Sequence, residues 1–137
     1  MTSENAKVPL SNSIAPWLSV RNSAKAVEFY KAAFGAIEAY RIQDPDGNVV
    51  ARLSVNRAEF WVADESSAHQ NFSPESLGGS TVRIILTVAD PDAVFDQAIK
   101  AGATQVYAVS EGHGWHVGRI ADPYGHHWEI GRPVARA

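Results

Sequence analysis

The chain has 137 residues, a formal net charge of −3, a pI near 5.9 and no cysteine. This length accommodates one domain, or two small halves that share a core. The balance of 45% hydrophobic and 20% charged residues is typical of globular proteins. The acidic charge argues against a nucleic-acid partner, and the lack of cysteine excludes disulfides and thiolate chemistry.

The chain begins with residues 1–12, which we expect to form a flexible arm. This stretch has no apolar run of signal-peptide length, and no later segment approaches the roughly 18 apolar residues of a membrane span. The absence of cysteine fits a reducing compartment. We therefore expect a cytoplasmic protein without membrane association.

Residues 13–65 have the pattern of a βαβββ module. The helix is bounded by Asn22 or Ser23 as N-cap and by Gly35 as stop, and its apolar residues recur at helical spacing. A turn at 44–48 separates two strands of a hairpin. The expected strands of this module are 13–20, 37–43, 49–55 and 58–65.

Residues 66–80 are polar and rich in serine and glycine, as expected of a linker. After them the βαβββ pattern returns over 81–132, with Asp90 at the start of the helix and Gly102 at its end. A short tail, 133–137, follows. The expected strands of this second module are 81–88, 103–109, 115–122 and 126–131.

The two modules align at a constant shift of 68 residues. This shift places Leu18 on Leu86 and Val20 on Val88 in the first strands. It also places Phe60 on Trp128 and Val62 on Ile130 in the last strands, so that Val62 and Ile130 are predicted core positions. A shared offset at both ends indicates two copies of one unit, neither of which can bury its sheet alone.

The paired modules and the ending "DPYGHHWEIG" (122–131) resemble the vicinal oxygen chelate superfamily over residues 12–132. The superfamily includes glyoxalases, extradiol dioxygenases, fosfomycin-resistance enzymes and bleomycin-binding proteins, and the ending looks most like the PhnB-like branch. The resemblance implies an α+β fold, in which two tandem βαβββ modules form a curved, barrel-like mixed sheet with helices outside.

In metal-using members of that superfamily, two first-strand and two fourth-strand side chains meet a divalent ion. The resemblance places these positions at Ala15, Trp61, Arg83 and Glu129. Alanine has no donor atom, indole nitrogen has no free lone pair, and arginine stays protonated. Since a catalytic metal needs about three protein ligands, we expect no metal and no cofactor at these positions.

Two alternatives stay open around Glu129. Strand alternation puts His127 on the same face as Glu129, and His116 on the neighbouring strand would complete a rebuilt metal site; His126 at the turn is expected to be solvated. Otherwise Arg83 and Glu129 pair with each other. That pair is either a polar floor for a ligand or a purely structural salt bridge.

Aromatic side chains supply the remaining signal. Trp17 and Ser19 share the face of their strand opposite Leu18, and Trp61 shares the face opposite Phe60. The facing of Tyr107 and Trp115 is not determined by the pattern. The residues predicted to bind a ligand are Trp17, Ser19, Trp61, Arg83, Tyr107, Trp115 and Glu129.

These residues favour a metal-independent protein that encloses an aromatic or antibiotic-like small molecule in a Trp-lined cavity, as bleomycin-binding relatives do. The resemblance also implies a homodimer with the pocket at the subunit interface. The alternative is a lyase, isomerase or dioxygenase, with Glu129 as base or with the rebuilt metal site. A third reading is a structural or interaction domain with no small-molecule site.

Overall fold

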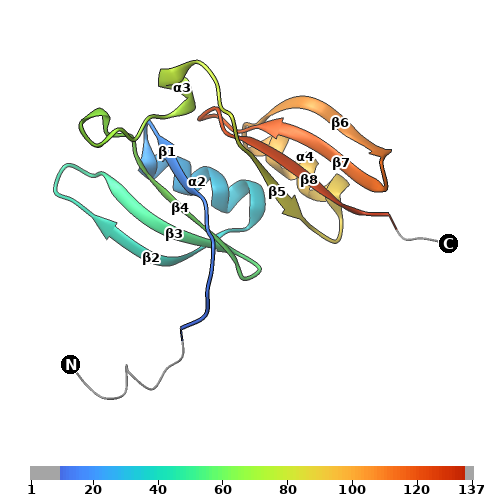
Figure 1. Ribbon diagram of the computed structural model, residues 1–137, viewed down its shortest axis with the longest axis horizontal. Helices are drawn as coiled ribbons and strands as arrows, with labels where there is room; N and C mark the ends of the chain where they lie inside the picture. Colours follow the sequence, from blue (N-terminus) through green and yellow to red (C-terminus); the bar gives the residue numbers. More distant parts are fainter. Residues whose placement is uncertain (1–9, 135–137) are drawn as a thin grey trace.

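The computed structural model describes residues 10–134, so most of the predicted arm and tail lies outside the described residues. Two four-stranded sheets lie side by side, and the two long helices lie against the same side of them (Figure 1). The sheets are curved but do not close into a barrel. The predicted α+β fold of two tandem βαβββ modules is thereby confirmed.

The first module begins with a strand that is shorter than predicted. Its elements are β1 (Trp17–Val20), α2 (Ser23–Phe34), β2 (Ile37–Gln43), β3 (Val49–Val55) and β4 (Ala58–Asp64). Asn22 caps α2, because its side chain accepts a hydrogen bond from the backbone N–H of Lys25 at 3.2 Å. Gly35 ends the helix with a left-handed φ of 68°.

The predicted linker contains two short helical turns, η1 (Ser67–His69) and α3 (Pro74–Leu77). Glu65 holds this segment against the first module: its carboxylate accepts the backbone N–H of Ser73 at 2.9 Å and the hydroxyl of Ser76 at 2.9 Å. The hydrogen bond from the Ser73 backbone is the main reason that the pKa of Glu65 lies below its ordinary value.

The second module repeats the first. Its elements are β5 (Arg83–Thr87), α4 (Pro91–Ala101), β6 (Thr104–Gly112), β7 (Trp115–Ala121) and β8 (His127–Pro133). Asp90 caps α4 by accepting the N–H of Ala93 at 3.2 Å. Within residues 10–134, no helix has the length and apolarity that crossing a bilayer requires.

Pairing between the first and last strands of each module reproduces the repeat. The strand orders are β1-β4-β3-β2 and β5-β8-β7-β6, and the first strand of each module runs parallel to the last. Leu18 pairs with Val62 in one sheet and Leu86 with Ile130 in the other. Leu86 and Ile130 each lie 68 residues after their counterparts Leu18 and Val62, as the sequence repeat predicts.

The core lies between the sheets and helices and joins the modules. Trp128 of β8 packs against Phe34 and Phe60 of the first module, with ring centroids 4.7 and 5.2 Å apart. Helices α2 and α4 also pack on each other, and the side chain of Gln97 donates to the carbonyl of Ala32 at 2.8 Å. The two halves therefore share one hydrophobic core.

Asp122, the first residue of the DPYG turn, is a buried polar anchor within that core. Its Oδ2 accepts the hydroxyl of Tyr30 at 2.5 Å and the indole N–H of Trp128 at 2.9 Å, while Oδ1 accepts the N–H groups of Tyr124 and His126. Burial raises the pKa of Tyr30 well above its ordinary value, and the charge of Asp122 raises it further. One carboxyl group thus ties the second module to α2 of the first.

Candidate functional site

Among the described residues, each sheet has one face against which no helix packs, and we call this its open face. Strand alternation assigns residues to it: Leu18 and Val20 are buried towards α2, whereas Trp17 is 51% exposed. Several large hydrophobic side chains are exposed on the two open faces. They are Trp17, Ile37, Tyr40, Ile42, Ile85 and Tyr107. Apolar groups displayed in this way are typical of interaction or ligand-binding surfaces.

The open face of the first module carries an indole pair. Trp17 of β1 and Trp61 of β4 are register partners, and their rings stack with centroids 5.6 Å apart and an interplanar angle of 18°. Arg52 of β3 pairs with Trp61 and places its guanidinium 5.5 Å from the indole ring centre, a cation–π geometry. The predicted facing of both tryptophans is correct.

The open face of the second module carries charge at the equivalent place. Glu129 of β8 accepts two hydrogen bonds on Oε2 from Arg119, at 3.3 Å from Nε and 3.0 Å from Nη2. The Nε of Arg83 lies 3.4 Å from the same oxygen. The predicted Arg83–Glu129 ion pair is therefore present, but Arg119 is a third member that sequence reasoning missed.

Arg119 has a counterpart in the first module. Tyr40 and Arg52 lie in one row across the first sheet, and Tyr107 and Arg119 lie in the corresponding row of the second. The guanidinium of Arg119 lies 5.2 Å from the ring centre of Tyr107. The sequence alignment did not reveal this equivalence, because Arg52 and Arg119 are 67 residues apart, whereas the first and last strands of the modules align at a shift of 68.

A cavity of about 330 Å³ lies beside Glu129. Its walls come from β5, the end of β6 with the turn that follows, β7 and β8, and none of its lining residues belongs to the first module. Those residues are Ile85, Gly112, His113, Trp115, Val117 and Glu129. The facing of Trp115 is thereby settled: it lies on the open face, next to the charged group.

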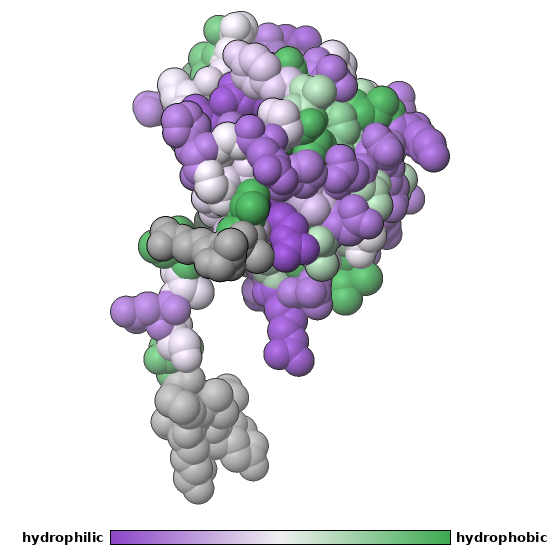
Figure 2. All heavy atoms as spheres, turned by 90° about the vertical axis from the view of Figure 1, so that its right-hand side faces the viewer, coloured by the Kyte–Doolittle hydropathy of each residue, from purple (hydrophilic) through white to green (hydrophobic). Residues whose placement is uncertain are grey.

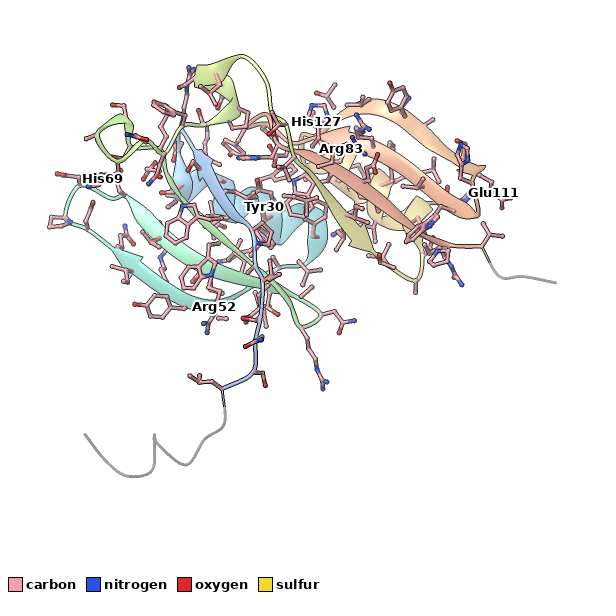
Figure 3. All side chains as sticks on the ribbon, in the orientation of Figure 1. Tyr30, Arg52, His69, Arg83, Glu111 and His127 are labelled. Atoms are coloured by element: carbon pink, nitrogen blue, oxygen red, sulfur yellow. The ribbon has the colours of Figure 1, made fainter. Side chains whose placement is uncertain are left out.

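The predicted ligand-binding residues thus form two groups, one on each sheet. Figure 3 shows Arg52 on the first sheet, whereas Arg83 and His127 lie near the start of the second. Ser19 is on the same side of β1 as Trp17 but is buried. Ala15 lies ahead of β1 rather than on it. The strand starts after Pro16, whose ring lacks the N–H that would extend the ladder.

His127 lies on the same face of β8 as Glu129, as predicted, but His116 and His126 are directed elsewhere. His116 lies on the helix side of β7, where its Nε2 is 2.8 Å from a carboxylate oxygen of Asp92 on α4. His126 is only partly exposed, contrary to the expectation of a solvated side chain, and its Nε2 is 2.9 Å from the carbonyl oxygen of Ser19. The prediction that His116 joins His127 and Glu129 in a metal site is therefore wrong.

These donors do not fit a divalent metal ion. The one carboxylate at the four superfamily positions is already bound by two guanidiniums, whose positive charge would repel a cation. Across residues 10–134, no cluster of three or more histidine, aspartate or glutamate side chains has a metal-binding arrangement.

A larger groove of about 830 Å³ lies between the β3–β4 turn and β5. Small aliphatic side chains line most of it, and its one charged side chain is Arg132. That guanidinium already donates to the carbonyl of Ala89 at 2.9 Å. The groove thus has few groups that would orient a ligand, so the cavity beside Glu129 is the better candidate.

A family model described as a glyoxalase-like domain matches residues 17–131. The chain belongs to this family. An uncharacterised protein of Mycobacterium tuberculosis is 41% identical over 126 residues, which cover 88% of this chain and 74% of that one. The match does not single out the PhnB-like branch.

Solved structures agree with the family assignment. A gene product of Arabidopsis thaliana has a TM-score of 0.70 at 31% identity, over 90% of this chain and all of that one. The fosfomycin-resistance protein FosX of Listeria monocytogenes, solved with Mn(II) and sulfate, shares the fold with a TM-score of 0.67 at 13% identity, over 90% and 93% of the two chains. The wider glyoxalase/bleomycin resistance/dioxygenase superfamily shares this architecture.

Proposed function

We propose that this glyoxalase-like protein is a metal-independent binding protein for an aromatic small molecule. The observation that carries the proposal is the occupation of Glu129 by Arg83 and Arg119. The structure of FosX from Listeria monocytogenes contains Mn(II). The carboxylate of this chain is engaged by cations of its own, which supports binding without metal-dependent turnover.

The stacked pair of Trp17 and Trp61 supplies the aromatic wall. Stacking a ligand ring on an indole contributes about 0.5–1.5 kcal/mol beyond the burial of apolar area. Trp17 is about half exposed, so one side of the pair is accessible to a ligand. Binding of this kind needs affinity and abundance and requires no transition-state groups.

We further propose that the chain works as a homodimer. Helices α2 and α4 pack together within one chain, and no helix of residues 10–134 covers either open face. A second copy would cover the apolar side chains of these faces, with the Trp17–Trp61 wall of one copy over the Glu129 cavity of the other. In contrast, hydrophilic side chains predominate on the surface seen from the second-module side of the molecule (Figure 2).

The proposal is tested by calorimetric titration of metal-stripped protein with a panel of two- and three-ring aromatic compounds that includes 2-naphthalenemethanol. We expect saturable binding that EDTA leaves unchanged. Trp61→Leu should weaken it about 2- to 12-fold, the equivalent of the stacking energy. Phe72→Leu, which changes an exposed aromatic side chain of the linker, is the matched control.

Native mass spectrometry of the same sample reports whether the chain is a dimer. The proposal fails if no compound of the panel binds. It also fails if binding appears only after a stoichiometric divalent metal is restored, or if the bound compound is chemically converted.

A further inference from the structure

The open faces carry an unequal set of charges. Strand alternation places three arginines there, Arg52, Arg83 and Arg119, but only two glutamates, Glu59 and Glu129. The whole chain, in contrast, has a formal charge of −3. Positive charge is therefore concentrated on the faces where the proposed ligand binds.

The excess lies at Glu129. Arg52 is balanced by Glu59, whose carboxylate is 3.5 Å from its Nε. Arg83 and Arg119 instead share the single carboxylate of Glu129, and all three of their contacts are made to Oε2. One carboxylate neutralises one guanidinium, so this cluster retains a net charge of about one positive unit.

The cluster is also held in place for binding. Arg119 is fixed on two sides, by Glu129 at 3.0 Å and by the ring of Tyr107 beneath its guanidinium. Arg83 is 54% exposed, and of its guanidinium nitrogens the structure pairs Nε with Glu129. A planar guanidinium held in this way can present its remaining N–H groups to a carboxylate in a bidentate geometry.

An apolar cavity lies next to these donors. Ile85, Trp115 and Val117 line the space of about 330 Å³ that reaches Glu129. This volume is at the lower end of the range for small-molecule sites, which suits a body of one or two rings. Glu129 lines this cavity and contacts both arginines, so a ligand could place its aromatic body in the cavity and its acidic group at the guanidiniums beyond Glu129.

We infer that the ligand of this site is a small aromatic acid of one or two rings, whose anionic group binds Arg83 and Arg119. The inference rests on the proposed function and specifies its ligand class. Glu129 acts here as a positioning residue: it orders the two guanidiniums and limits their charge. It is not a partner of the ligand's anionic group, because like charges repel.

The test compares two probes of the same ring system, 2-naphthoate and neutral 2-naphthalenemethanol, by calorimetric titration of the full-length protein. We expect 2-naphthoate to bind at least tenfold more tightly. Raising NaCl from 0.05 to 0.5 M should weaken the binding of 2-naphthoate and leave the affinity for 2-naphthalenemethanol nearly unchanged, since salt screens exposed charges.

Variants separate charge from structure. Arg83→Gln should weaken 2-naphthoate at least fivefold and leave 2-naphthalenemethanol unchanged. Arg41→Gln is the matched control, because Arg41 lies on the helix side of β2, where it pairs with Glu38. Glu129→Gln removes the competing negative charge and should strengthen 2-naphthoate binding several-fold, with circular dichroism and thermal melting to check the fold.

Equal affinity for the two probes would overturn the inference and leave the proposed function standing. Loss of 2-naphthoate binding in a folded Glu129→Gln protein would also overturn it, because removal of the competing negative charge is expected to strengthen binding of the acid. If neither probe nor any other aromatic compound bound, both proposals would fall together.

Discussion

Replacing Tyr30 by phenylalanine removes one hydroxyl group from the link between the two modules. The hydroxyl donates to Oδ2 of Asp122 at 2.5 Å, and both residues are almost fully buried. The phenylalanine ring keeps the aromatic packing against Phe60 and Trp128. The substitution therefore tests the hydrogen bond rather than the core volume.

The expected cost follows from the type of bond. A hydrogen bond to a charged group contributes about 1.5–3 kcal/mol to the free energy of unfolding. The unfolding entropy is about 2.1 cal/mol/K per residue, so for a chain of this length 1 kcal/mol corresponds to about 3.5 °C in Tm. We expect Tyr30→Phe to lower Tm by about 5–10 °C, measured by differential scanning calorimetry at pH 7.

Tyr124→Phe is the matched control. Tyr124 is also buried, but its hydroxyl has no hydrogen-bond partner among the residues that the structure describes. Its loss should change Tm by less than about 2 °C, in line with a substitution that breaks no hydrogen bond. Equal Tm shifts in the two variants would refute the assignment of Asp122 as the anchor.

Alkaline pH provides a second readout. The pKa of Tyr30 is raised, chiefly by burial, above the value of about 10 that tyrosine has in an unfolded chain. A group with a raised pKa contributes stability that is fully present below the unfolded pKa and is lost as the pH rises further. Above about pH 10, Tm should therefore fall more steeply in the wild type than in Tyr30→Phe. Parallel curves would contradict this explanation.

Two other substitutions test the packing of the second module and the anchoring of the linker. A Cβ at Gly131 would lie 2.6 Å from the Cβ of Val117, so Gly131→Ala should cost about 1–3 kcal/mol in a urea titration, whereas Gly112→Ala, with no atom within 4 Å of its added Cβ, should cost much less. The pKa of Glu65 is lowered, mainly by the backbone N–H of Ser73, so its contribution to stability is present above its ordinary pKa and is lost as the pH falls further. Tm between pH 6 and pH 3 should accordingly fall less in Glu65→Gln than in the wild type, and a larger fall in the variant would show that Glu65 is not the anchor.

Local patterns in the chain were sufficient to predict the repeated fold. Hydrophobic alternation placed Leu18 and Val62 in the core and Trp17 and Trp61 on the other face, and the structure confirms both assignments. The facing of these side chains depends on strand period, which neighbouring residues in the sequence encode directly. The pairing of Arg83 with Glu129 was implied by the resemblance to the superfamily, and the structure confirms it.

Other features depend on contacts that are distant in the sequence. Arg119 reaches Glu129 because β7 and β8 pair with one more residue between partners than β3 and β4 have, and that difference breaks the simple repeat. His116 binds Asp92 because α4 covers that face of the sheet, and His126 reaches a carbonyl of the other module. The sequence alone determined where the repeat lies and which face is apolar in the first and last strands of each module. Only the tertiary structure decided that Arg119 also binds Glu129 and that His116 binds Asp92, because a side chain's partner depends on hairpin length and helix packing.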